Sequence, residues 1–334
     1  MKILCLTDRY LDFLGDQILY GLRYHLGSDV VDFPKKEILY KSYKDKIDSS
    51  MLWAGGGYAF GMEESNIDRE EIEQKIKNHY FDWIINLNCW RINSQNLPNL
   101  IAIDGEDHSL IHPKYYGRVI AYFKRELLAN VRGILPIQFS LPDHLLDLSI
   151  QEKIKEIHAS FSIYPGIREE ISQFYPTAMF SQWHDYMNDV KKSWFGVSPK
   201  GAGYDCQRHY EILGNAILCI YIDHGAPRIL KESFIDNVNC LIFQSVDELR
   251  GKIISCRNRE SLIERGRNDL RKYHLSSVRA LQILDKLENF KVHRKKYFFS
   301  HAIKYSYYPF YKRKFSNRYT AFLIGLIKKY FKSR

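Results

Sequence analysis

A glycine-containing segment between residues 195 and 216 carries the residue types best suited to binding a phosphate group. Residues 195–198 predict a short strand, which runs into a loop containing Gly201 and Gly203. A helix is expected to begin near Asp205, a residue type that commonly caps helix N-termini. Glycines let a ligand approach the backbone closely, and the free N–H groups of a helix start favour an anion. The segment therefore predicts a phosphate-binding turn.

Two charged side chains of the expected helix extend this chemistry. Arg208 lies in its first turn, where a guanidinium can donate a fixed set of hydrogen bonds to a diphosphate. Glu211 lies one turn further on the same face, where its carboxylate can accept hydrogen bonds from a ribose or sugar hydroxyl. Two glycines alone favour an ordinary turn, in which Arg208 and Glu211 are a solvated pair on an exposed helix face. The complete string favours the binding interpretation.

The segment resembles the donor-binding segment of GT-B-fold glycosyltransferases, in particular family-1-like and exostosin-like bacterial enzymes. Their pattern is approximately S-P-x-G-x-G-x-D-x-x-R-x-x-E-x-L-x-x-G-A. The matching residues here are Ser198, Pro199, Gly201, Gly203, Asp205, Arg208, Glu211 and Leu213. Asn215 departs from the pattern, which has glycine before the alanine. The resemblance covers residues 155–285. It implies that Lys200 and Arg208 bind the donor diphosphate and that Glu211 binds the ribose or the sugar. The other residues of the implied donor-binding set are Ser198, Gly201, Gly203, Tyr204 and Asp205.

The pattern of apolar segments predicts the elements that must position these residues. A strand over 2–7, a helix over 14–26 and a strand over 30–33 form a βαβ unit, which requires a parallel sheet. Further strands are expected over 81–86 and 100–103. A helix is expected over 117–130, with Lys124, Arg125 and Glu126 on its exposed face.

A second alternating series follows a boundary near 140–152. It consists of strands near 157–163, 194–197, 217–221 and 240–243, and helices near 182–192, from 205, over 246–256 and over 259–287. Together with the resemblance, this predicts an α/β chain of two Rossmann-like domains facing a cleft, the GT-B arrangement, with a basic aromatic helical tail. The expected divisions are an acceptor-side domain over 1–145, a nucleotide-sugar-binding domain over 146–290 and a tail over 291–334.

The acidic cluster after the strand at 100–103 is expected at the carboxyl end of the first sheet, where open α/β sheets bind ligands. In an inverting GT-B enzyme a general base removes the proton of the acceptor hydroxyl. Asp107 and His108 are the candidates, with Asp8 after the first strand as another. A capped acidic turn is an equally good explanation for any one of them. A metal site of the GT-A type is disfavoured, because those enzymes bind the nucleotide in their N-terminal half. No metal or other cofactor is therefore expected.

Composition and charge narrow the class of protein. The 334 residues are 45% hydrophobic and 26% charged, values that exclude a disordered, fibrous or polytopic membrane protein. The six cysteines form no C-x-x-C pair and are expected to be buried free thiols of a cytoplasmic protein. The net charge of +10 is concentrated at one end: residues 291–334 hold 13 Lys or Arg, 13 aromatic residues and no Asp or Glu.

This tail predicts a peripheral anchor on the inner face of a membrane, because basic residues bind anionic headgroups and aromatic residues settle at the interface. A solubilising tail and a nucleic-acid-binding tail are the alternatives, and the donor motif favours the membrane. The expected function is transfer of a sugar from a nucleotide-sugar donor to a glycan or lipid-linked acceptor, as in lipopolysaccharide or capsule synthesis. The alternative is a non-catalytic nucleotide-binding protein recruited to membrane or nucleic acid by its tail.

Overall fold

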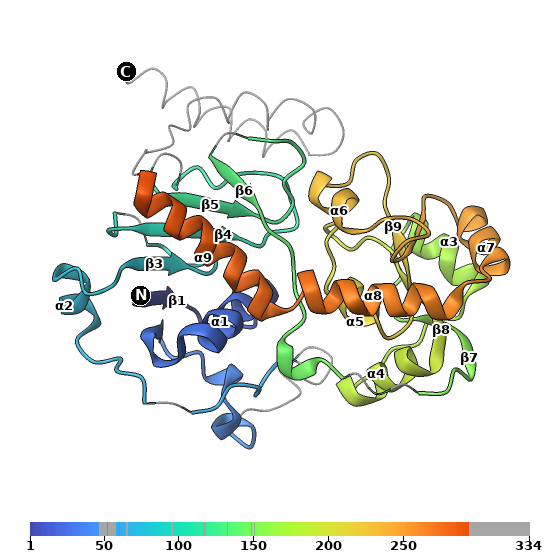
Figure 1. Cartoon of the computed structure of the whole chain (residues 1–334), viewed down its shortest axis with the longest axis horizontal. Coiled ribbons are helices and arrows are strands. Elements are labelled where there is room, and N and C mark those ends of the chain that lie inside the picture. The colour runs from blue at the N-terminus through green and yellow to red at the C-terminus, as the bar shows by residue number, and fades with distance from the viewer. Residues whose placement is uncertain are drawn as a thin grey trace.

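The computed structural model describes residues 1–293, apart from 47–51, 53–57, 65, 95, 116, 117, 132, 148 and 150. These residues form two α/β halves, each built on its own parallel sheet (Figure 1). The basic tail predicted over 291–334 lies outside the described residues from 294 onward, so its anchoring role stays a prediction.

The first sheet has six parallel strands in the order β2-β1-β3-β4-β5-β6. The strands are β1 (Ile3–Leu6), β2 (Val30–Phe33), β3 (Trp83–Asn86), β4 (Leu100–Asp104), β5 (Ala121–Lys124) and β6 (Ile134–Pro136). Helix α1 (Phe13–Leu26) connects β1 to β2, and α2 (Ile72–Lys77) precedes β3. Asp12 caps α1 by accepting a hydrogen bond from the N–H of Gly15. The strand ends of β1, β3, β4 and β5 therefore share one edge.

The second sheet has four parallel strands in the order β10-β9-β8-β7. They are β7 (Lys155–Ala159), β8 (Ser193–Ser198), β9 (Ile217–Tyr221) and β10 (Leu241–Phe243). The helices of this half are α3 (Ile167–Phe174), α4 (Trp183–Lys192), α5 (Gln207–Ile212), α6 (Arg228–Ser233), α7 (Val246–Ser255) and α8 (Arg259–Tyr273).

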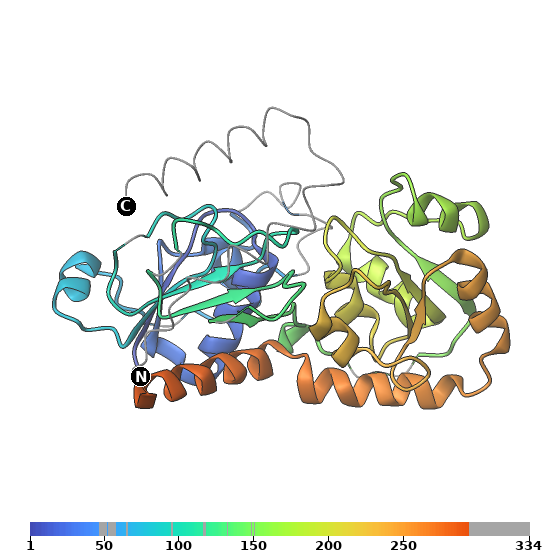
Figure 2. The same ribbon diagram turned by 90° about the horizontal axis from the view of Figure 1, so that it is seen from above.

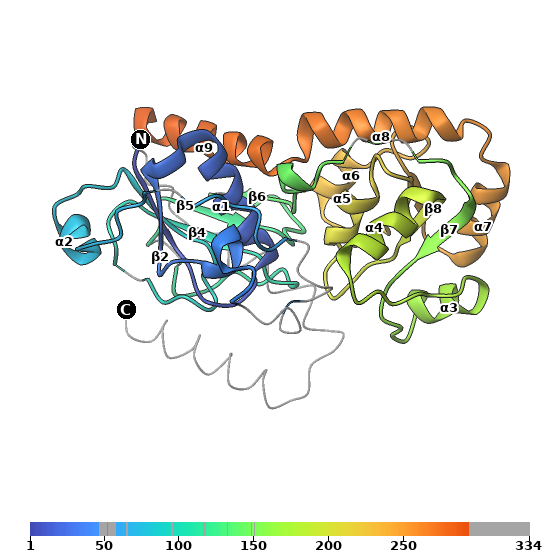
Figure 3. The same ribbon diagram turned by 90° about the horizontal axis from the view of Figure 1, so that it is seen from below.

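The helix α9 (Ser276–His293) returns from the second half to the first. Figures 2 and 3 show α8 along the second half and α9 continuing along the same side of the molecule onto the first. It packs closely on α1: a Cβ atom on Gly21 would lie 1.9 Å from the carbonyl oxygen of Ser276. The two halves are thus joined both by the chain after β6 and by this helix. Among the described helices, none has the length and apolar character needed to span a bilayer.

Three sequence expectations need correction. The helix predicted over 117–130 is wrong: the described residues 118–130 contain the strand β5 (Ala121–Lys124), which lies between β4 and β6. All four residues of β5 are buried, so it lacks the polar alternation that identifies a strand. The expected helix over 259–287 is interrupted at His274 and Leu275, which separate α8 from α9. Helix α5 has Cys206 at its N-cap position instead of Asp205.

Candidate active site

The glycine loop, residues 199–206, connects the carboxyl end of β8 to α5. The N–H of Gly201 donates to the carbonyl oxygen of Gly203 at 2.9 Å and to Sγ of Cys206 at 3.2 Å, so the loop folds back on itself. Ser198, the last residue of β8, is fully buried. The parallel sheet thus places the loop at the strand edge where α/β folds bind ligands.

Three cations gather around this loop. Arg208 donates from Nη2 to the carbonyl oxygen of Pro199 at 3.0 Å, and Arg168, from the first turn of α3, donates from Nε to the carbonyl oxygen of Lys200 at 2.8 Å. Both guanidinium groups lie 5.8 Å from the ring centre of Phe161. Among the described residues, neither arginine nor Lys200 has a carboxylate within ion-pair distance. Their positive charges are therefore available to bind an anionic ligand.

Unsatisfied polar atoms lie in the same place. The Nε of Arg208 and the Oγ of Ser198 are both buried without a hydrogen-bond partner in the described part of the chain. Burial, together with the neighbouring charge of Arg208, lowers the pKa of Arg168. Buried polar groups without partners are costly, so a cluster of them beside uncompensated cations indicates a binding site for an anion.

Two carboxylates of the predicted donor set are engaged within the protein. Asp205 is 2% exposed, and its carboxylate accepts hydrogen bonds from the N–H of Phe139 at 2.7 Å and the hydroxyl of Tyr210 at 2.8 Å. Glu211 is also buried and accepts a hydrogen bond from the hydroxyl of Tyr58 in the first half. Burial raises the pKa of Glu211. Both side chains hold the loop and α5 in place.

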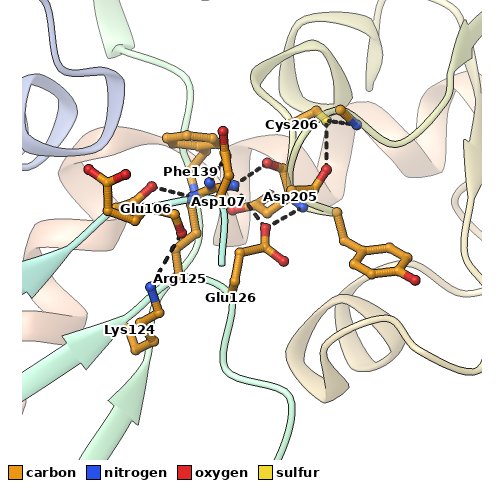
Figure 4. A network of polar contacts seen from close by, with 12 residues as sticks. Glu106, Asp107, Lys124, Arg125, Glu126, Phe139, Asp205 and Cys206 are labelled. Atoms are coloured by element: carbon orange, nitrogen blue, oxygen red, sulfur yellow. Dashed lines mark hydrogen bonds and ion pairs between the residues drawn. The ribbon is translucent and has the colours of Figure 1, made fainter. Parts of the chain in front are cut away.

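A charge network at the carboxyl end of the first sheet meets the glycine loop from the other side (Figure 4). Arg125, which follows β5, pairs with Asp107 and, at 2.9 Å, with Glu126. It also donates to the backbone oxygen of Asp205, while Glu126 accepts from the N–H of Asp205 at 3.0 Å. The guanidinium lies 4.5 Å from the ring centre of Phe139. One arginine thereby links the two halves.

The side chains predicted on an exposed helix face are the buried members of this network. Lys124 is fully buried and pairs with the equally buried Asp104 at 2.7 Å. Arg125 and Glu126 are 1% and 3% exposed. The sequence interpretation was wrong here, because the counter-charges come from residues on other strands and loops. Gly203 completes the contact: a Cβ atom there would lie 2.5 Å from Oε1 of Glu126 and 3.0 Å from Oδ1 of Asp107.

The candidate bases occupy different surroundings. Asp107 is exposed and lies beside Gly203, so it faces the glycine loop. His108 packs edge-to-face on Trp90 with ring centres 4.8 Å apart, and its Nδ1 is buried without a partner in the described chain. Burial, with a smaller contribution from Lys124, lowers the pKa of His108. Asp8 lies apart from this contact, with Lys36 at 3.1 Å and Arg91 at 3.9 Å as its ion-pair partners.

A cavity of about 270 Å³ lies where residues of the two halves come together. Its lining comes from both halves: Leu127, Ala129, Asn130, Pro136, Arg228, Ile229 and Glu232. Within the described ranges, no three His, Cys, Asp or Glu side chains are grouped to hold a metal ion. The arrangement combines an anion site on the second half with titratable groups on the first.

Sequence reasoning missed several residues of this region. Arg168 lies two residues after Gly166, in the first turn of a helix that comes after a strand. This succession of strand, glycine and helix with an arginine was visible in the sequence. Glu106 belongs to the acidic cluster, and burial and the nearby Asp104 raise its pKa, as suits a proton acceptor. Asp223, beyond β9, carried no motif and is placed only by the sheet.

Comparison with protein-family models and with curated protein sequences gives no match. Solved structures do match. A glycosyltransferase from Rickettsia africae has a TM-score of 0.52 at 10% identity, covering 87% of this chain and 98% of that one. Anabaena Alr3699/HepE in complex with UDP has a TM-score of 0.48 at 10% identity, covering 86% and 100%. Sucrose-phosphate synthase from Thermosynechococcus elongatus has a TM-score of 0.46 at 11% identity, covering 88% and 100%.

At these identities the likeness concerns the fold. The Rickettsia africae structure matches over nearly the whole of both chains, so it includes both halves described above. The class is therefore a mixed α/β protein with two parallel sheets and the GT-B-like arrangement, which confirms the α/β fold class predicted from the sequence; the helical form of the tail stays a prediction.

Proposed function

We propose that this protein is a glycosyltransferase that transfers a sugar from a nucleotide-sugar donor to a glycan or lipid-linked acceptor. The observation that supports this is the group of three cations around the glycine loop, Lys200, Arg208 and Arg168, none with a carboxylate partner in the described chain. Most nucleotide sugars carry a diphosphate, an anion that accepts charge-assisted hydrogen bonds from such a group. The Rickettsia africae protein of the same fold is a glycosyltransferase.

The chemistry assigns a task to each half. When the bond between the sugar C1 and the diphosphate oxygen breaks, negative charge develops on the departing diphosphate, and the cations stabilise it. On the first half, Asp107 or His108 accepts the proton of the acceptor hydroxyl in an inverting reaction. Because its pKa is lowered, His108 is neutral at pH 7 and able to accept that proton.

A thermal-shift screen against UDP, GDP, CMP, ADP and dTDP sugars tests the proposal. A ligand at about 100 times its Kd adds about 2.7 kcal/mol to the free energy of unfolding. One donor should stabilise the protein, and incubation with it should release free nucleotide. Stabilisation without release would favour the non-catalytic nucleotide-binding protein. No stabilisation by any donor would contradict a nucleotide site of either kind.

The location at the cytoplasmic face of a membrane is a proposal from the tail alone. Its 13 basic and 13 aromatic residues within 291–334 support binding to an anionic surface at about 1 kcal/mol per basic residue. Removing residues 294–334 should abolish co-sedimentation with anionic liposomes and leave donor binding unchanged. Equal sedimentation of the shortened protein would contradict the anchor.

A further inference from the structure

Lys200 is held against an aromatic face instead of a carboxylate. Its Nζ lies 4.2 Å from the ring centre of Tyr204, which follows Gly203 in the glycine loop. A cation over the face of a tyrosine is attracted by the electrons of the ring, but its charge is not neutralised. The ring therefore fixes the position of the ammonium group and leaves its full charge available.

The Tyr204 ring is itself fixed by Asp223, just beyond the carboxyl end of β9. The Tyr204 hydroxyl donates to Oδ1 of Asp223 at 2.7 Å, and the N–H of Gly225 donates to the same oxygen at 2.7 Å. The other oxygen, Oδ2, accepts from the hydroxyl of Tyr221 at 3.0 Å. Although burial raises the pKa of Asp223, these hydrogen bonds and the charge of Lys200 lower it below its usual value. The carboxylate is therefore ionised at neutral pH.

We propose that Asp223 is a positioning residue that acts through Tyr204 to hold Lys200 ready for the donor diphosphate. The inference rests on the proposed function, since it requires Lys200 to bind that diphosphate. Tyr204 lies between the other two groups: Asp223 contacts its hydroxyl, and Lys200 lies on the face of its ring. The negative charge thereby steadies the lysine without forming an ion pair that the diphosphate would have to break. An ammonium group already in place loses less conformational freedom on binding.

A double-mutant cycle tests whether Tyr204 acts through Lys200. The probe is the free nucleoside diphosphate, chosen from UDP, GDP, CDP, ADP and dTDP as the one that stabilises the wild-type protein most. Its Kd is measured by calorimetry at fixed ionic strength. Lys200→Ala and Tyr204→Leu should each weaken binding by about 3- to 30-fold. In the Lys200→Ala background, Tyr204→Leu should cost less than about twofold, because the lysine it held is gone.

Variants of Tyr204, Asp223 and Tyr221 test the hydrogen bond that fixes the ring. Tyr204→Phe keeps the ring and loses the hydrogen bond, so it should weaken binding less than Tyr204→Leu. Asp223→Ala should resemble Tyr204→Leu, and Asp223→Asn, which keeps an acceptor oxygen, should recover part of the loss. Tyr221→Phe is the matched control, since it removes the other phenol from Asp223 without touching Lys200, and should leave the Kd unchanged. Thermal unfolding checks that each variant folds.

The outcomes separate this inference from the proposed function. Additive losses in the cycle, or a loss for Tyr221→Phe equal to that for Tyr204→Phe, would overturn the positioning role while leaving the nucleotide site intact. Unchanged binding in Lys200→Ala would overturn it as well. If no nucleoside diphosphate binds the wild-type protein, the proposed function fails and the inference fails with it.

Discussion

The carboxyl edges of the two sheets both carry buried charges, but only the first edge pairs its cations with carboxylates. On the first sheet each cation has a carboxylate partner: Lys124 pairs with Asp104, and Arg125 pairs with Asp107 and Glu126. On the second sheet Arg168 and Arg208 donate only to backbone oxygens in the described chain. A neutralised network can stabilise the fold without any ligand, whereas uncompensated cations gain their partner only when an anion binds.

This difference predicts where a substitution damages stability and where it damages binding. Removing a cation from the first edge leaves buried carboxylates without their counter-charge. Removing one from the second edge relieves repulsion between cations and takes away a ligand contact.

Arg125→Ala should be the most damaging change. It removes one partner of a buried ion network and leaves Glu126 uncompensated, which costs about 3–5 kcal/mol of unfolding free energy. Urea denaturation measures the loss. Arg250→Ala is the control, because Arg250 lies on α7 with a half-exposed side chain, 3.7 Å from Asp247. If Arg125→Ala unfolds at the wild-type urea concentration, the network does not hold the two halves together.

Arg208→Ala and Arg168→Ala should cost less stability than Arg125→Ala and should weaken the donor site. Each substitution takes away the charge-assisted hydrogen bonds that we propose to the diphosphate, which corresponds to about 10- to 100-fold in affinity. Calorimetry with the stabilising nucleotide measures the loss of affinity. Thermal unfolding without ligand should show a decrease smaller than that of Arg125→Ala, because only hydrogen bonds to backbone oxygens are lost. A fall in stability equal to that of Arg125→Ala would erase the distinction between the two edges. Wild-type affinity in Arg208→Ala would remove this arginine from the site.

Gly203→Ala tests the contact where the two edges meet. The added Cβ atom would lie 2.5 Å from the Glu126 carboxylate, so the loop or the acid must shift, at a cost of about 1–3 kcal/mol. Thermal unfolding measures the change. Gly251→Ala is the matched control in helix α7, where the new Cβ meets nothing within 4 Å, and it should be neutral or stabilising. Equal behaviour of the two variants would mean that the halves do not press together at Gly203.

The same contrast explains what the sequence could reveal. The turn after β8 was predicted because its information is local: a strand, two glycines, a helix and Arg208 lie within a short stretch. The burial of Lys124, Arg125 and Glu126 depends on Asp104, Asp107 and Asp205, which lie up to 80 residues away. A charged run after an apolar segment has the composition of an exposed helix until its partners are known. For the same reason the link from Asp223 to Tyr204 had no local signal.

The pH dependence of turnover separates the candidate bases on the first edge. Burial lowers the pKa of His108 below its ordinary value of 6.5. If neutral His108 is the base, kcat/KM should therefore stay constant between pH 8 and pH 6.5. Protonation at lower pH should then reduce the rate of nucleotide release along a single limb. His108→Gln should remove this limb together with most of the activity. If the limb persists in His108→Gln and is lost in Asp107→Asn, the carboxylate beside Arg125 is the proton acceptor. In that case Arg125 not only joins the two halves but also holds the base toward the glycine loop.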